Sequence, residues 1–345
     1  KGLDAMPWCP RCETGISEQE RREGYKNVED TAVFVQFPLV GREREYLLVW
    51  TTTPWTLAAN VAAAVNPELT YVQARQNGNL YYVAQTLVGI MKEKGEFTLE
   101  GTVKGAQMVG WQYEGPFDDL DIVKKTFQQA GYTHRIIAWE EVSDSDGTGI
   151  VHIAPGCGKE DFDLGKEQKL PILMPIDESG IYVSGYGFLT GQPAAKVADQ
   201  VLENLRQKGI YYKKEKFKHD YPHCWRCGAP LLFRAVDEWY INMSWRNEIM
   251  EVVKQIRWIP EWGKDQELNW LENMHDWMIS KKRFWGLALP IFECSCGWFD
   301  VIGGYDELKQ RAVEGWDKFK GQSPHRPWVD AIRIKCEKCG GLAKR

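Results

Sequence analysis

The chain has 345 residues, of which 43% are apolar and 26% are charged. These values exclude an intrinsically disordered protein, and the length is sufficient for two or three domains. The 43 Lys and Arg residues against 48 Asp and Glu residues give a net charge of −5. This balance excludes a uniformly basic nucleic-acid binder but permits a local basic groove.

The longest uncharged stretch, Tyr46 to Pro67, has the length of a membrane helix but contains Pro54, Asn60 and Asn66. We therefore interpret it as a strand, a loop and a second strand, with no membrane contact. The chain has no recognisable secretion signal, and this favours the cytoplasm. It begins without Met, and its last residues, a lysine and an arginine, do not complete the local sequence pattern. We therefore expect a fragment of a longer protein.

Strand-forming residues dominate the region from Asp30 to Val83. β-branched and aromatic residues predict strands at 32–37, 45–50, 70–72, 80–83, 136–142 and 149–153. Helices are expected at 85–94, 159–169 and 193–208, and the last of these has an apolar face. Together these elements predict a mixed α+β fold in which a β-barrel or sheet carries helices on its outside.

Two loops in this region are rich in chemically useful groups. In the first, Thr51, Thr52, Thr53 and Thr56 surround Pro54 and Trp55, and Asn60 follows. Hydroxyls at a strand end can hold a sugar, an ester or a water molecule, although threonine is also common in ordinary strands. The second loop, 147–161, has His152 at one end and Asp161 at the other. It is equally compatible with a site and with a strand, a turn and a helix N-terminus stabilised by Asp161.

Eight of the nine cysteines form four close pairs, which are Cys9 and Cys12, Cys224 and Cys227, Cys294 and Cys296, and Cys336 and Cys339. Such spacing favours tetrahedral zinc with four thiolates, because a chain of this length does not need disulfides and no secretion signal is present. The alternatives are a thioredoxin-like redox pair at Cys9 and Cys12, or four unrelated pairs. We interpret the ninth cysteine, Cys157, as a packed small residue.

Each zinc needs two pairs, and the order of the pairs predicts a domain organisation. The last two pairs are close enough in sequence for a zinc-ribbon-like module at 292–345. The first pair must then meet Cys224 and Cys227, so most of the intervening chain is an inserted domain with zinc at its stalk. We expect a stalk at 1–27, the inserted domain at 28–215, and the second half of the first zinc site at 216–291.

The clearest basic runs are Lys213 to His219 and Lys281 to Arg283. Their simplest interpretation is a solvated surface. Aromatic residues interleave with the lysines of the first run, and this pattern also suits contact with the end of an RNA strand.

Five motifs, in this order, resemble the isoleucyl-tRNA synthetase family of class I aminoacyl-tRNA synthetases. They are Cys9 to Thr14, Trp50 to Leu57, Gly147 to Pro155, Tyr221 to Cys227, and Asp276 to Ser280 with Phe284 to Gly286. The valyl and leucyl relatives carry Thr-Thr-Arg-Pro where this chain has Thr52 to Trp55. The isoleucyl branch therefore fits best, and the resemblance covers nearly the whole chain.

The resemblance implies that the inserted region is a β-barrel editing domain, which hydrolyses valine mistakenly joined to isoleucine tRNA. By this resemblance, Asp161 binds the α-ammonium and His152 forms a wall that rejects isoleucine. Catalytic roles fall to Thr52, Thr53 and Asp161, and Thr51, Trp55, Thr56 and Asn60 contribute to substrate binding. The implied mechanism is direct attack by a positioned water.

The resemblance also implies cofactors and partners. Zinc is expected at two sites, and the partners are the acceptor end of isoleucine tRNA, valine or isoleucine esters, valyl-adenylate and the remainder of the synthetase. The family's His-Ile-Gly-His and Lys-Met-Ser-Lys-Ser signatures are absent, so ATP and Mg²⁺ are expected only in the full-length enzyme. A zinc-organised tRNA-binding fragment without activity is the alternative.

Overall fold

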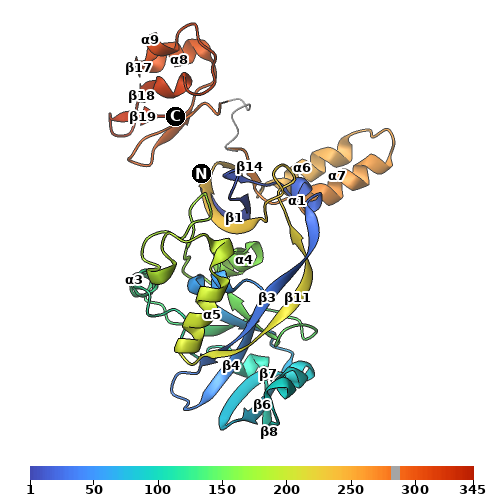
Figure 1. The fold of residues 1–345 in the computed structure, drawn as a ribbon. Helices are drawn as coiled ribbons and strands as arrows, with labels where there is room; N and C mark the ends of the chain where they lie inside the picture. The colour runs from blue at the N-terminus through green and yellow to red at the C-terminus, as the bar shows by residue number, and fades with distance from the viewer. Residues whose placement is uncertain (281–287) are drawn as a thin grey trace. The chain divides into compact units, whose positions relative to one another are not determined.

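The computed structural model describes residues 1–280 and 288–345, which form two compact units, Lys1–Glu238 and Trp239–Arg345 (Figure 1). The predicted basic run Lys281 to Arg283 and the motif Phe284 to Gly286 lie outside the described residues. The domain boundaries predicted at 27, 215 and 291 stay predictions.

The first unit is built on a mixed sheet of nine strands that curls into a half-barrel. Along it the strands follow the order β8-β6-β7-β4-β10-β5-β9, and β3 pairs with both β4 and β11. The bounds are β3 (Tyr25–Pro38), β4 (Glu45–Thr51), β5 (Ala62–Val65), β6 (Thr70–Gln76), β7 (Asn79–Ala84), β8 (Thr98–Lys104), β9 (Arg135–Ala138), β10 (Ile150–Ile153) and β11 (Tyr211–Pro222). The predicted mixed α+β, barrel-like fold is confirmed.

Strands β3 and β11 leave the sheet as a long antiparallel ribbon, visible as the blue and yellow strands that run side by side in Figure 1. The ribbon pairs Ala32 with Glu215 near the sheet and Tyr25 with Pro222 at its far end. There the chain joins a small sheet of order β12-β1-β2, formed by Leu232–Glu238, Gly2–Cys9 and Thr14–Gly15. The ribbon therefore connects the half-barrel to the cysteine-bearing turns.

Within residues 1–238, nine helical segments accompany these sheets, and apart from α1, which buries no side chain, each contributes buried residues. They are α1 (Glu18–Arg22), η1 (Pro54–Ala59), η2 (Gln85–Lys94), α2 (Gly105–Met108), α3 (Asp121–Ala130), α4 (Lys159–Glu167), η3 (Gly187–Leu189), η4 (Ala194–Lys196) and α5 (Ala198–Gln207). The buried side chains of Val201, Leu202 and Leu205 confirm the apolar face predicted for α5. The segment 85–94 forms a 3₁₀-helix, and Gly89 together with β-branched residues accounts for its weak α-helix preference.

The second unit contains a helical pair and a small five-stranded sheet. Its elements are β13 (Tyr240–Ile241), α6 (Arg246–Gln255), α7 (Trp262–Glu272), β14 (Trp277–Met278), β15 (Ile291–Glu293), β16 (Phe299–Val301), α8 (Tyr305–Arg311), β17 (Ala312–Glu314), α9 (Trp316–Phe319), η5 (Val329–Ala331), β18 (Arg333–Lys335) and β19 (Leu342–Lys344). The sheet order is β16-β15-β19-β18-β17. Every helix in the described part of the chain is too short or too polar to span a bilayer.

Candidate functional site

Sheet pairing brings the two polar loops predicted from the sequence to the same place. Strands β4 and β10 are parallel neighbours, with Val151 opposite Trp50, and both run toward the same edge of the sheet. Thr51, the last residue of β4, and His152 each follow this pair by one position. The carboxyl ends of adjacent parallel strands are a common place for a site, because the following loops converge there.

The threonine side chains form a connected line of hydroxyls that ends on His152. The Oγ1 atoms of Thr51 and Thr53 are 3.3 Å apart, and those of Thr53 and Thr56 are 3.1 Å apart. The Oγ1 of Thr56 lies 2.9 Å from Nε2 of His152 and donates to the carbonyl of Thr53. Since the Thr56 proton is directed to that carbonyl, Nε2 of His152 is the donor to Thr56, and this fixes its tautomer.

The environment keeps the His152 imidazole neutral. The side chain is 7% exposed, and burial lowers its pKa to about 4. Its other ring nitrogen, Nδ1, is buried and has no hydrogen-bond partner among the described residues. In the tautomer fixed by Thr56, Nδ1 carries a lone pair, so it can accept a hydrogen bond from a substrate group.

Asp161 lies in the first turn of α4 and reaches back toward the end of β10. Its Oδ2 accepts a hydrogen bond from the Ala154 backbone N–H at 2.8 Å. Burial raises the pKa of this carboxyl to about 6, although the Ala154 contact acts in the opposite direction. A desolvated carboxylate of this kind is stabilised by any cation brought next to it, and a ligand ammonium would meet that need.

A cleft of about 360 Å³ opens beside the threonine loop. Its lining includes Thr52, Thr53 and Trp55 from the threonine loop and Tyr221 and His223 from the far end of the ribbon. His152 and Asp161 are not among its lining residues. Three of the residues predicted from the sequence, Thr52, Thr53 and Trp55, therefore line the cleft.

The Asn60 side chain is engaged in internal hydrogen bonds, and its predicted substrate-binding role stays a prediction. Asn60 is 3% exposed, and its amide donates to the Ala62 carbonyl at 2.9 Å while its Oδ1 accepts from the Tyr113 hydroxyl at 2.7 Å. The Asn60 side chain therefore stabilises the threonine loop through these two hydrogen bonds. Tyr182, whose hydroxyl donates to the Trp55 carbonyl, has the same kind of role. No sequence signal identified Tyr113 or Tyr182.

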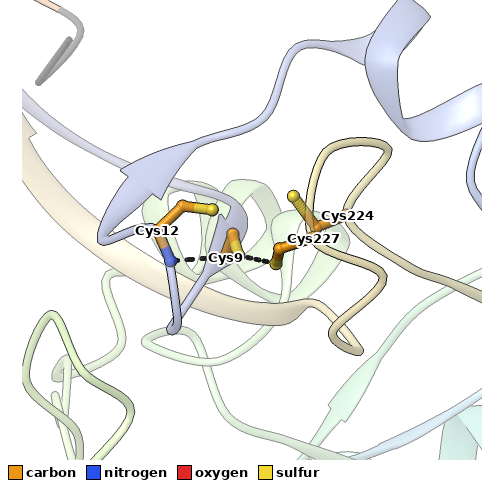
Figure 2. Close-up of side chains that lie close together, drawn as sticks. All are labelled: Cys9, Cys12, Cys224 and Cys227. Carbon is orange, nitrogen blue, oxygen red and sulfur yellow. Dashed lines mark hydrogen bonds between the residues drawn. The ribbon is translucent and has the colours of Figure 1, made fainter.

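The eight paired cysteines gather into two groups of four, as Figure 2 shows for the first. Within each group the sulfurs lie within 4.8 Å of one another. In the first group, Sγ of Cys9 is 3.5 Å from Sγ of Cys227, although 218 residues separate them. In the second, Cys294 and Cys339 are 3.5 Å apart. The predicted partnership of the four pairs is confirmed, and each group is able to hold a metal ion.

Cys157 lies outside both groups. It is buried, and desolvation raises its pKa well above the usual value for a thiol. A thiol with a raised pKa is a poor nucleophile, in agreement with the interpretation of Cys157 as a packed residue.

Residues 1–315 match the family described as tRNA synthetases class I (I, L, M and V). The isoleucine–tRNA ligase of Methanocaldococcus jannaschii is 37% identical over 358 residues, and the alignment covers 100% of this chain and 34% of that protein. The isoleucine–tRNA ligase of Clostridium tetani is 38% identical, with 100% of this chain and 32% of that protein covered. The chain thus spans about a third of the length of these relatives.

Among solved structures, the editing domain of the P. falciparum cytosolic leucyl-tRNA synthetase aligns with a TM-score of 0.42 and 11% identity, over 54% of this chain and 99% of that one. The sequence relatives agree with the isoleucyl branch indicated by the five motifs. Since the family match covers most of its length, the chain belongs to the class I tRNA synthetases of the isoleucine, leucine, methionine and valine group.

Proposed function

We propose that this part of an isoleucyl-tRNA synthetase hydrolyses the ester bond of valyl-tRNA(Ile). The observation that carries the proposal is the placement of Asp161, His152 and the threonine hydroxyls at one edge of the sheet. An editing site must bind an α-ammonium, hold a terminal ribose and place a water on an ester carbonyl. The desolvated Asp161 carboxylate suits the first task, and Thr52 and Thr53, which line the cleft, suit the other two.

The chemistry we propose is attack by water, with no covalent intermediate on the protein. The pKa of His152 is lowered to about 4, so this residue is neutral at pH 7 and does not supply a proton. Instead, it orients Thr56 through Nε2 and presents Nδ1 as an acceptor. The hydroxyls of Thr52 and Thr53 position the water and the ribose. Most of the rate enhancement then comes from holding the water next to the ester carbonyl.

Editing is needed because one methylene separates isoleucine from valine. A single methylene is worth about 1 to 3 kcal/mol in an apolar pocket, a value established for this enzyme family, which limits discrimination in one binding step. A second site that admits only the smaller amino acid corrects the remainder. Incubation of the chain with valyl-tRNA(Ile) tests the proposal. Release of valine at the buffer rate alone would support the inactive, zinc-organised tRNA-binding fragment instead.

We further propose that the two cysteine groups hold zinc. Four sulfurs within 4.8 Å of one another match the donor set of tetrahedral structural zinc. Zinc in the first group would link the segment before β3 to the segment after β11, and its ligands would be Cys9, Cys12, Cys224 and Cys227. Zinc in the second group would stabilise the C-terminal module, with Cys294, Cys296, Cys336 and Cys339 as ligands. Neither group contributes to the hydrolysis.

Replacing His152 by Ala should change selectivity more than rate. If its ring forms the wall of the side-chain pocket, H152A leaves valyl-tRNA hydrolysis substantial and newly admits isoleucyl-tRNA. A shorter side chain makes room for isoleucine in the pocket before it impairs the hydrolysis itself. Both esters would be measured on each variant. As the matched control, H152Q preserves much of the volume and a donor to Thr56, so it should continue to reject isoleucine. Loss of both hydrolyses in a folded H152A would assign His152 to water positioning instead.

A further inference from the structure

His134 is a buried histidine whose two ring nitrogens both face hydrogen-bond acceptors. The residue directly precedes β9 and is 4% exposed. Its Nε2 lies 2.6 Å from Oδ1 of Asp118, and its Nδ1 lies 3.0 Å from the backbone carbonyl oxygen of Val61. Because a backbone carbonyl can only accept, Nδ1 carries a proton and donates it to Val61. His134 takes no part in the water attack proposed above.

Asp118 holds the other ring nitrogen as an ionised carboxylate. Burial acts to raise the pKa of Asp118, but the hydrogen bond and the charge of His134, together with the Gly115 N–H, lower it below its usual value. The Gly115 N–H donates to Oδ2 at 2.7 Å, and Oδ1 accepts from Nε2 of His134. Both ring nitrogens therefore donate, and the ring is an imidazolium that is paired with Asp118.

The surroundings of this pair fix the imidazole in position. The ring centroids of Phe127 and Tyr113 lie 4.6 and 4.9 Å from that of His134. A Cβ atom at Gly115 would lie only 2.2 Å from Nε2 of His134, so the absence of a side chain there lets the backbone pass this close. The Nδ1–H of His134 is thus directed at a single carbonyl.

The carbonyl that His134 holds belongs to Val61, the residue at which the threonine loop (residues 51–60) returns to the sheet. The Val61 N–H donates to the carbonyl of Ile153 at 2.9 Å, and Ile153 directly follows His152. Val61 is therefore bonded to the strand of His152 through its N–H and to His134 through its carbonyl. A shift of Val61 would change how the end of the loop sits against His152.

We propose that His134 is a positioning residue for the hydrolysis, and that Asp118 keeps its ring in the form that holds Val61. The pair touches neither the ester nor the water. Instead it fixes the end of the loop whose hydroxyls place them, and a displacement of about 1 Å can cost about a hundredfold in rate. The effect on hydrolysis rests on the proposed function, whereas the support of the loop rests on the hydrogen bonds of the imidazolium.

Two substitutions of His134 separate the roles of its two nitrogens. The amide nitrogen of Asn can occupy the place of Nδ1, and that of Gln can occupy the place of Nε2. H134N therefore keeps a donor for Val61, whereas H134Q keeps only the contact with Asp118. We expect H134N to hydrolyse valyl-tRNA(Ile) at close to the wild-type rate, and kcat of H134Q to fall about a hundredfold with KM unchanged. Both variants lose the imidazole ring, so a purely structural role would affect them equally.

Hydrogen exchange across residues 53–61, followed by mass spectrometry, gives a readout that needs no hydrolysis. The amides of Thr56, Asn60 and Val61 in this segment donate to backbone carbonyls. They should exchange faster in H134Q and at the wild-type rate in H134N. If the wild-type chain hydrolyses no ester while H134Q still loosens the loop, the editing proposal fails and the support of the loop by His134 stands. Equal exchange in the two variants, or equal kcat where the wild type is active, would overturn the proposal.

Asp118 offers a second pair of variants, in which the imidazole is retained. The Asn of D118N can accept from Gly115 and donate to Nε2, so that a neutral His134 still donates to Val61. D118A provides no partner for Nε2, and the ring is then free to move its remaining proton away from Nδ1. We expect D118A to lower kcat and D118N to restore it, with D119N, a change in the exposed neighbouring acid, behaving as wild type. Unchanged kcat in D118A, or equal losses in D118A and D118N, would overturn the role of Asp118.

Discussion

Replacing Asp161 by Asn is expected to lower valyl-tRNA hydrolysis by a factor of about 10 to 150. The change removes a charge-assisted contact with the α-ammonium, worth about 1.5 to 3 kcal/mol, and every aminoacyl ester needs that contact. Asn retains an oxygen that can accept from the Ala154 N–H, so the loop itself should keep its place. Initial rates with valyl-tRNA on D161N and wild type measure the effect.

The same substitution should stabilise the fold at neutral pH. Burial raises the pKa of Asp161 to about 6, above the unfolded value of about 3.9. A raised carboxyl pKa means that stability is fully present below the unfolded pKa and is lost as pH rises from about 4 to 6. D161N removes this loss, so its free energy of unfolding at pH 7 should exceed that of wild type by about 1 to 3 kcal/mol. Denaturant unfolding at pH 4 and pH 7 checks the prediction.

The pH profile of hydrolysis should follow the same group. Because Asp161 must be ionised to bind an ammonium, kcat/KM of the wild type should fall as pH drops below about 6. Glu160→Gln is the matched control. This neighbouring acid is exposed and its charge helps to raise the pKa of Asp161, so the variant should keep the wild-type rate at pH 7 while its profile moves to slightly lower pH. Equal rates in D161N and wild type would place the ammonium site elsewhere.

Removing zinc is expected to unfold the C-terminal module at 292–345. Its core consists of ten buried residues, and two of them, Cys294 and Cys336, belong to the second cysteine group. A core of this size contributes little net stability by itself, whereas structural zinc contributes about 10 kcal/mol or more. Hydrogen exchange followed by mass spectrometry, with and without a chelator, should show protection lost across this module.

Metal analysis supplies the matched controls for this prediction. The wild-type chain should contain two zinc ions, and Cys336→Ser should contain one. Cys157→Ser changes the one cysteine outside both groups and should still contain two. Two zinc ions in Cys336→Ser, or unchanged protection after chelation, would rule out zinc as the organiser of this module.

The sequence predicted those features that depend on local spacing. Four close cysteine pairs sufficed to predict both groups, because each sulfur pair must share a metal with another pair. The barrel-like sheet followed from β-branched runs, and the helix at Ala198–Gln207 followed from its apolar period. These features need no knowledge of which strands are neighbours.

The geometry of the site could not be predicted in this way. The approach of Thr56 to His152 depends on the parallel pairing of β4 with β10, which joins segments about a hundred residues apart. Asn60 was expected to face the substrate, yet the hydroxyl of Tyr113 draws its side chain inward. The aromatic period of β11 is visible in the sequence, but the cleft that it borders appears only once the ribbon lies beside the threonine loop.

The most direct test of the proposed editing site compares two esters of the same tRNA. Valyl-tRNA(Ile) and isoleucyl-tRNA(Ile) would be incubated with the 345-residue chain, and the release of each amino acid followed over time. We expect rapid hydrolysis of the valyl ester, at least tenfold faster than that of the isoleucyl ester, with D161N slow on both. Equal hydrolysis of both esters, or no hydrolysis above buffer while the chain is folded and contains zinc, would contradict editing by this site.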